Sequence, residues 1–192
     1  MTVTFPLTGE PLALDLLNTR PAESGDLIAA PPGLAAWLEA QAGRLTPVAE
    51  VGAAEVAAVH AVREAASPAL AAARRGERPP AGALRALNAA LAGAPAHREL
   101  VWGEGGGGGL AAASHRTAAP PRRLAAELAE AVAELLTDPR VGEVRECEGA
   151  ECVLLFLPAN PRRRWCVASV CGNRARVARY YARHGKGGSE SS

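Results

Sequence analysis

Four cysteines lie close together near the end of the chain, and they are all the cysteines that the 192-residue sequence contains. They form two Cys-x4-Cys pairs within 25 residues: Cys147, Cys152, Cys166 and Cys171. A divalent zinc ion takes four tetrahedral ligands, and two loops that each offer a pair of thiolates can supply them. Because no ligand position is left for water, the pattern predicts one structural zinc ion rather than a catalytic metal.

Other uses of four cysteines stay open. Two disulfides would form in an oxidising compartment, and four thiolates also hold iron–sulfur clusters. The sequence begins without a basic segment followed by an apolar stretch, so we expect a cytoplasmic protein with reduced thiols. Zinc is therefore the favoured metal, and basic surroundings could also make its thiolates responsive to oxidants.

Arginines crowd around the cysteine pairs. Residues 172–184 are predicted to form a helix that begins at the last cysteine, and Arg176, Arg179 and Arg183 share one face of it at i, i+3 and i+7. The other side, expected to face the rest of the cysteine-rich module, carries Val177, Tyr180, Tyr181 and His184. The candidate nucleic-acid-binding residues are Arg162, Arg163, Arg174, Arg176, Arg179 and Arg183.

The charge of the chain is strongly polarised, although its net value is only +1. Residues 1–151 carry 13 Lys or Arg and 19 Asp or Glu, a net charge of −6. Residues 152–192 carry eight Lys or Arg and one acid, a net charge of +7. This asymmetry favours an anionic partner for the C-terminal part. Arginines fix a protein on DNA through phosphates and read bases in the major groove.

The cysteine-rich module resembles the CGNR zinc-finger family. The resemblance rests on Arg163-Arg164-Trp165-Cys166, Cys171-Gly172-Asn173-Arg174 and the intervening Leu155-Phe156. Pro158 departs from the acidic residue that the family usually has there, and the loop between Cys152 and Cys166 is short. The upstream part is similar to the usual partner of this finger, the ABATE domain of stress-induced transcription regulators. Its supporting residues are Leu17-Asn18-Thr19, Trp37-Leu38, Arg63-Glu64-Ala65 and Leu87-Asn88.

The resemblance implies a DNA-binding regulator of transcription in the stress response, with a structural zinc ion. The residues themselves leave a second class open, a zinc-stabilised protein-interaction or redox-responsive adaptor that does not bind DNA. Arg164 and Arg174 could serve structure instead, and Trp165 is expected to pack in the module's core. Binding of zinc-loaded protein to DNA, compared with an Arg176/Arg179/Arg183→Ala variant, separates the two classes.

The remaining chain has the composition of an alanine-rich helical scaffold. Apolar residues make up 48% of the sequence but aromatic residues only 4%, so small side chains must build much of the core. Prolines in the first turn and apolar stripes predict helices over 31–39, 79–91 and 120–136. The longest stripe covers 47–75, where Pro68 is expected to kink or interrupt the helix. Residues 11–19 predict a short helix, with a strand as the alternative.

A hairpin and an abrupt change of composition complete the predicted organisation. Residues 98–118 predict a β-hairpin around Gly105 to Gly109, and without a following Lys-Ser/Thr these glycines indicate a loop rather than a phosphate site. The predicted fold is mainly α (α+β), with an α-rich N-terminal domain that includes the short hairpin. The predicted divisions are the N-terminal domain at 1–139, a four-cysteine zinc finger ending in a basic helix at 140–184, and a flexible tail at 185–192.

Signs of catalysis and of membrane insertion are lacking. No Gly-x-Ser-x-Gly motif occurs, and no metal-binding pair spacing relates His60, His97, His115 and His184, so we predict that the protein is not an enzyme. No run of about 18 apolar residues predicts a membrane span. A small-molecule or protein effector could bind the N-terminal domain, with pocket residues among Asn18, Thr19, Arg63 and Asn88. Helix capping is the alternative role for such polar residues.

Overall fold

A computed structural model describes residues 5–103 and 109–184 of the chain, and within them it confirms the predicted mainly α fold. The helices are α1 (Leu12–Leu17), α2 (Pro31–Ala40), α3 (Ala53–Ala73), α4 (Ala81–Gly93), α5 (Pro120–Thr137) and α6 (Asn173–His184). The strands are β1 (Ala96–Trp102), β2 (Leu110–Arg116), β3 (Arg145–Glu146) and β4 (Leu155–Phe156). Residues 105–108 of the predicted glycine turn at 105–109, and the predicted tail at 185–192, lie outside the described residues.

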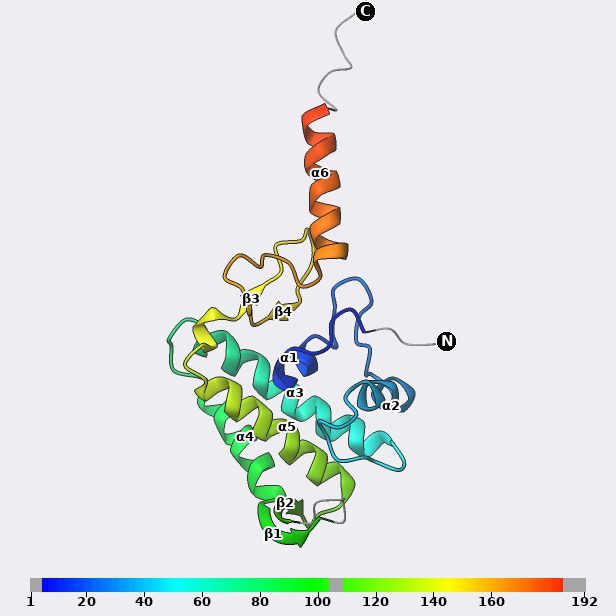
Figure 1. The fold of residues 1–192 in the computed structure, drawn as a ribbon, viewed down its shortest axis with the longest axis vertical. Helices are drawn as coiled ribbons and strands as arrows, with labels where there is room; N and C mark the ends of the chain where they lie inside the picture. Colours follow the sequence, from blue (N-terminus) through cyan, green and yellow to red (C-terminus); the bar gives the residue numbers. More distant parts are fainter. Residues whose placement is uncertain (1–4, 104–108, 185–192) are drawn as a thin grey trace, which may run out of the picture.

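The N-terminal helices pack around one alanine-rich core. Helices α3 and α5 form the centre and α4 packs against both, while α1 packs on α5 and α3 and α2 packs on α3 (Figure 1). Close packing of α3 on α5 is possible because both helices bury alanines such as Ala66, Ala69 and Ala129. Larger side chains that are fully buried include Trp37, Leu34, Leu124 and Leu128. The prediction of a core rich in small side chains is thus confirmed.

Prolines mark helix starts as predicted, but Pro68 does not interrupt α3. Helices α2 and α5 begin at Pro31 and Pro120, where the missing N–H has no intrahelical partner to lose. Pro68 lies inside α3, which continues to Ala73. Both Pro68 and Glu64, whose carbonyl loses its helical donor, are exposed, so water can satisfy that carbonyl. Of the two outcomes expected at Pro68, the interruption is therefore wrong, and the kink stays a prediction.

The hairpin β1–β2 confirms the predicted strands and lies at the end of the helical bundle far from α6 (Figure 1). The strands are antiparallel, with Ala96 opposite Arg116 and Trp102 opposite Leu110. Arg116 holds the base of the hairpin, because its guanidinium donates to Ala94 O and pairs with Glu130 of α5.

The C-terminal module, residues 140–184, sits on the opposite end of the bundle. It begins with the short 3-10 turn η1 (Val141–Glu143), which packs on α3 and α5. The antiparallel β3–β4 pair follows, and α6 projects away from the rest of the molecule (Figure 1). No helix in the described part of the chain is both long and apolar enough to cross a membrane.

Candidate metal centre and basic helix

Short elements bring the four cysteines together. Cys147 follows β3 and donates its N–H to Leu154 O at 2.9 Å, which closes the first cysteine loop. Cys152 lies at the end of that loop and Cys166 in the segment after β4. Cys171 lies in η2 (Ala168–Gly172), a π-helical turn that leads directly into α6. The metal ligands are therefore continuous with the basic helix.

The sulfur geometry fits a tetrahedral metal ion. The four Sγ atoms lie within 4.8 Å of one another. The Cys152–Cys166 and Cys166–Cys171 sulfurs are 3.8 and 3.6 Å apart. Zinc–sulfur bonds of about 2.3 Å in a tetrahedron place sulfurs about 3.8 Å apart, so the cluster already has the required size. Three of these cysteines are buried and Cys152 is half-buried, as expected for a closed structural site.

The chemistry of the thiols also calls for a cation. Burial raises the pKa of Cys171 to about 11 and raises the pKa of Cys166 as well. Burial opposes ionisation of Cys147 too, but N–H donors from Cys166 and Gly149, at 3.3 and 3.4 Å from its sulfur, outweigh it and lower the pKa. Four thiolates this close repel one another unless a metal ion neutralises them. The donor set therefore fits one divalent ion.

Two glycines let the backbone pass close to this centre. A Cβ at Gly149 would lie 3.0 Å from Cys171 Cβ and 3.2 Å from its sulfur. A Cβ at Gly172 would lie 3.2 Å from the ring of Trp165, which packs against the cysteine cluster as predicted. A side chain at either position would therefore be crowded unless its neighbours shifted.

Arg163 has a structural role at the base of the module. Its guanidinium pairs with Glu10 at 2.7 Å and lies 4.3 Å above the centroid of the Phe156 ring. It also donates to the carbonyls of Trp165 and Cys166, at 3.1 and 2.7 Å. These contacts occupy most of its donors inside the protein.

Two further arginines form ion pairs on the surface of the module. Arg164 donates to Glu148 at 2.7 Å, and Arg174 pairs with Glu23 of the N-terminal domain at 2.5 Å. Each pair raises the pKa of its arginine, through the hydrogen bond to the carboxylate. Structural roles for Arg164 and Arg174, which the sequence left open, are thus present.

Helix α6 exposes all of its faces. Arg176, Arg179 and Arg183 are exposed on it, as is Arg162 on the preceding loop. The apolar side was expected to face the module, but this expectation is wrong: Val177, Tyr180 and Tyr181 are 46%, 55% and 67% exposed. His184 is exposed and stacks on Tyr180. The physical reason is that α6 packs mainly on η2, apart from the Arg174–Glu23 ion pair at its first turn, so no second surface of the small module covers its apolar side.

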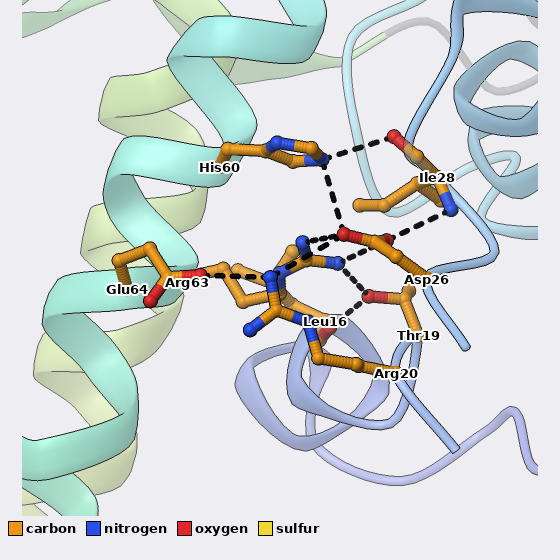
Figure 2. A network of polar contacts seen from close by, with 8 residues as sticks. All are labelled: Leu16, Thr19, Arg20, Asp26, Ile28, His60, Arg63 and Glu64. Atoms are coloured by element: carbon orange, nitrogen blue, oxygen red, sulfur yellow. Dashed lines mark hydrogen bonds and ion pairs between the residues drawn. The ribbon is translucent and has the colours of Figure 1, made fainter. Parts of the chain in front are cut away.

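A buried polar network organises the loop between α1 and α2 (Figure 2). Arg63 of α3, only 3% exposed, donates to Asp26 at 2.8 Å and to Thr19 at 2.8 Å. Figure 2 shows that Arg20 and His60 also approach Asp26, at 3.4 and 3.6 Å. Burial opposes ionisation of Asp26, but the hydrogen bonds and charge of Arg63 outweigh it and lower the pKa of Asp26 to about 2.

The four polar residues predicted for an effector pocket do not converge on one place. Thr19 and Arg63 meet in the network, but Asn88 is exposed on α4. Asn18 faces the C-terminal module: its amide donates to Leu155 O at 2.9 Å, and its carbonyl oxygen accepts from Leu155 N at 2.8 Å. Asn18, which directly follows α1, therefore links that helix to β4 through two hydrogen bonds.

Glu10, Glu23 and Asp26 make long-range ion pairs that the sequence did not predict. Glu10, only 8% exposed, accepts from Leu157 N at 3.0 Å in addition to pairing with Arg163. All three acids act on residues at least 37 positions away, and no local spacing signals such pairs. The sequence hinted at these ion pairs in one way: the N-terminal part has an excess of acids, and the C-terminal module is basic.

Comparison with known families assigns both parts of the chain. The ABATE family model, described as "Putative stress-induced transcription regulator", matches residues 10–139. The CGNR zinc-finger model matches residues 143–184. No curated protein matched the chain. Together with the sulfur geometry, the second match identifies one structural zinc ion in the module.

Proposed function

Because the chain belongs to the ABATE family and carries a CGNR zinc finger, we propose that it binds double-stranded DNA through α6 and regulates transcription in the stress response. The observation that carries this proposal is a helix that projects from the metal centre, buries none of its side chains and carries three exposed arginines.

The shape of α6 suits a groove of duplex DNA. Its 12 residues span about 18 Å at 1.5 Å per residue, and the major groove of B-DNA admits a single α-helix. The zinc ion fixes the start of the helix, because only Gly172 separates Cys171 from Asn173, the first residue of α6. An anchored helix enters the groove with less loss of conformational freedom than an unstructured basic segment.

The charges around α6 support phosphate contacts. Between Cys152 and His184 the sequence has no acid, so no carboxylate on the helix competes with DNA. Arg179 and Arg183 donate their Nε groups to backbone carbonyls one turn earlier, which leaves the ends of their guanidinium groups exposed. Arg163 and Arg174 already have partners, so the proposed contacts rest on Arg162, Arg176, Arg179 and Arg183.

The test compares DNA affinity at several salt concentrations. With about four phosphates neutralised, log K should fall with log salt with a slope of roughly −3 to −4. The Arg176/Arg179/Arg183→Ala variant should bind at least 30-fold more weakly and reduce the magnitude of the slope by about 3, as measured by fluorescence anisotropy with a labelled duplex.

A matched control removes the same charge elsewhere. Arg85/Arg98/Arg122→Ala changes three exposed arginines on α4, β1 and α5, and we expect its affinity to stay within about twofold. Equal losses in the two variants, or no duplex affinity in zinc-loaded protein, would overturn the DNA proposal. The exposed Val177, Tyr180 and Tyr181 would then favour a protein partner, as in the adaptor alternative. In either case we propose a cytoplasmic binding protein without catalytic activity.

A further inference from the structure

A cavity of about 420 Å³ lies between the N-terminal helices and the zinc finger. One wall is the face of α3 that carries Arg63, Ser67 and Leu70, with Arg20 beside it. The other wall comes from the finger and includes Val153 and Leu155. Its volume is within the range of small-molecule sites, about 300 to 1,000 Å³. A molecule bound there would touch both family domains at once.

Arg63 lines this cavity with a fixed guanidinium group, one of whose buried donors lacks an acceptor. The terminal nitrogens of its guanidinium are held by Asp26 and Thr19, so the orientation of the group is fixed. Its Nε is buried and has no hydrogen-bond partner among the residues that the structure describes. An unpaired buried donor is unfavourable, and an anion bound beside this guanidinium group would offset part of that cost through its charge.

Arg20 supplies a second, exchangeable positive charge at the same end. Figure 2 shows its guanidinium beside Arg63, paired with Glu64 at 2.9 Å. The side chains of Arg20 and Glu64 are 52% and 60% exposed, so this ion pair is weak and a ligand carboxylate can replace Glu64. The zinc-bound thiolate of Cys152, which also lines the cavity, repels an anion from the finger wall. A carboxylate therefore belongs at the Arg20–Arg63 end.

The rest of the cavity can take an apolar chain. Leu17 and Leu70 on the helical side and Val153 and Leu155 on the finger side line it. Arg74 and Glu146 also line it, but they pair with each other at 2.9 Å, and Arg74 donates to Val144 O as well. From Arg63 to Leu70, α3 advances about 10 Å at 1.5 Å per residue. That length corresponds to a carboxylic acid of roughly six to eight carbons.

We propose that this cavity binds a small carboxylate with an apolar body, such as a six- to eight-carbon acid, as an effector that bridges the N-terminal domain and the zinc finger. The carboxylate pairs with Arg20 in place of Glu64, close to the fixed guanidinium of Arg63, and the apolar body lies between Leu70 and Leu155. An occupied cavity joins the two walls and slows exchange of the Leu155 N–H, which already donates to Asn18.

Hexanoate is the probe, titrated into the zinc-loaded full chain without DNA and followed by two-dimensional amide NMR. We expect saturable shifts at Ser67, Leu70, Val153 and Leu155, slower exchange at Leu155, and at least tenfold weaker binding of the neutral analogue hexanamide. Because DNA is absent, the result is independent of the proposed DNA binding.

Three variants locate the site. Arg20→Ala removes an exposed charge and should weaken hexanoate binding at least fivefold. Ser67→Phe should place a ring in the path of the ligand between Arg63 and Leu70 and abolish binding. Ala61→Phe, an equally bulky change at an exposed position of α3 outside the cavity lining, should leave it unchanged. Hexanoate that does not saturate, that binds no better than hexanamide, or that binds equally well to Ser67→Phe would overturn the proposal.

Discussion

At the scale of single residues, the backbone at Gly149 passes between two of the zinc ligands. A Cβ there would lie 3.2 Å from Cys171 Sγ and 3.4 Å from Cys147 Sγ, and the cysteines cannot move away without leaving the metal. Overpacking of this kind costs about 1 to 3 kcal/mol. We therefore expect Gly149→Ala to weaken zinc binding by roughly five- to 100-fold, measured by competition with a chromophoric chelator.

Gly142 provides the control for this substitution. A Cβ at Gly142 would meet Arg74 O at 3.9 Å, an ordinary contact, so Gly142→Ala should leave the zinc affinity within about twofold. Wild-type affinity in Gly149→Ala would show that the first cysteine loop can shift without cost, contrary to the geometry described above.

Asp26 makes stability depend on pH with a definite sign. Its pKa in the folded protein is about 2, against an ordinary value of 3.8, so its stabilising effect is present above pH 4 and is lost as the pH falls toward 2. This shift corresponds to about 2 kcal/mol at pH 7. Asp26→Asn should lose at least that much, because Arg63 would remain buried and charged without its partner.

The measurement is the difference in unfolding free energy between the wild type and Asp26→Asn, from urea titrations at several pH values. Zinc loss in acid affects both proteins and largely cancels in the difference. We expect a gap of about 2 kcal/mol or more at pH 7 that shrinks steadily between pH 4 and pH 2. A gap that stays constant over this range would contradict the role assigned to the Asp26–Arg63 pair.

At the scale of elements, local sequence patterns predicted the helices and the metal ligands. Prolines followed by apolar stripes placed α2, α4 and α5, because these signals act within one or two turns. The cysteine spacing specified the metal site for a similar reason: the donors and the geometry of zinc determine the cluster, whatever the surrounding fold.

The contacts between elements could not be predicted in this way. Arg63 was predicted only as a candidate pocket residue, but it is buried and pairs with Asp26, which reaches it from a loop 37 residues earlier. The apolar side of α6 was expected to pack on the module, since a periodic stripe indicates which face is apolar and not whether a surface exists to cover it. Both outcomes depend on tertiary arrangement, which a helical period does not encode.

The junction between α1 and β4 allows a direct test of such a long-range contact. Asn18 is 3% exposed and makes two hydrogen bonds to the backbone of Leu155, 137 residues away. Asn18→Ala would leave both Leu155 groups without partners, at a cost of about 2 to 3 kcal/mol in unfolding free energy. Amide exchange at Leu155 should also become faster. Asn88→Ala, the same change at an exposed site on α4, should cost less than about 0.5 kcal/mol. Equal effects of the two substitutions would mean that the junction contributes nothing.

At the scale of the whole molecule, opposite charges hold the two family domains together. Glu10 and Glu23 of the acidic N-terminal part pair with Arg163 and Arg174 of the basic finger. The arginines nearest the bundle are thus paired, whereas Arg176, Arg179 and Arg183, farther along α6, are exposed. The helix that carries them projects away from the bundle (Figure 1). The charge asymmetry seen in the sequence therefore has two uses: it attaches the finger to the bundle, and it leaves the outer helix positive.

Removal of zinc should unfold the finger and leave the helical bundle folded. The finger's own apolar cluster is small, with Leu154 and Phe156 as its buried members besides cysteines, whereas the bundle has an extensive core across α1 to α5. About 40 residues with so little core do not fold alone, so the metal must supply most of the finger's stability.

After zinc is removed with a chelator under reducing conditions, we expect amide protection to disappear over 147–184 and to persist in α3 and α5. Helical circular dichroism should fall only by the share that α6 contributes. Loss of protection throughout the chain would mean that the bundle depends on the finger, and unchanged protection in α6 would mean that the metal does not hold the helix in place.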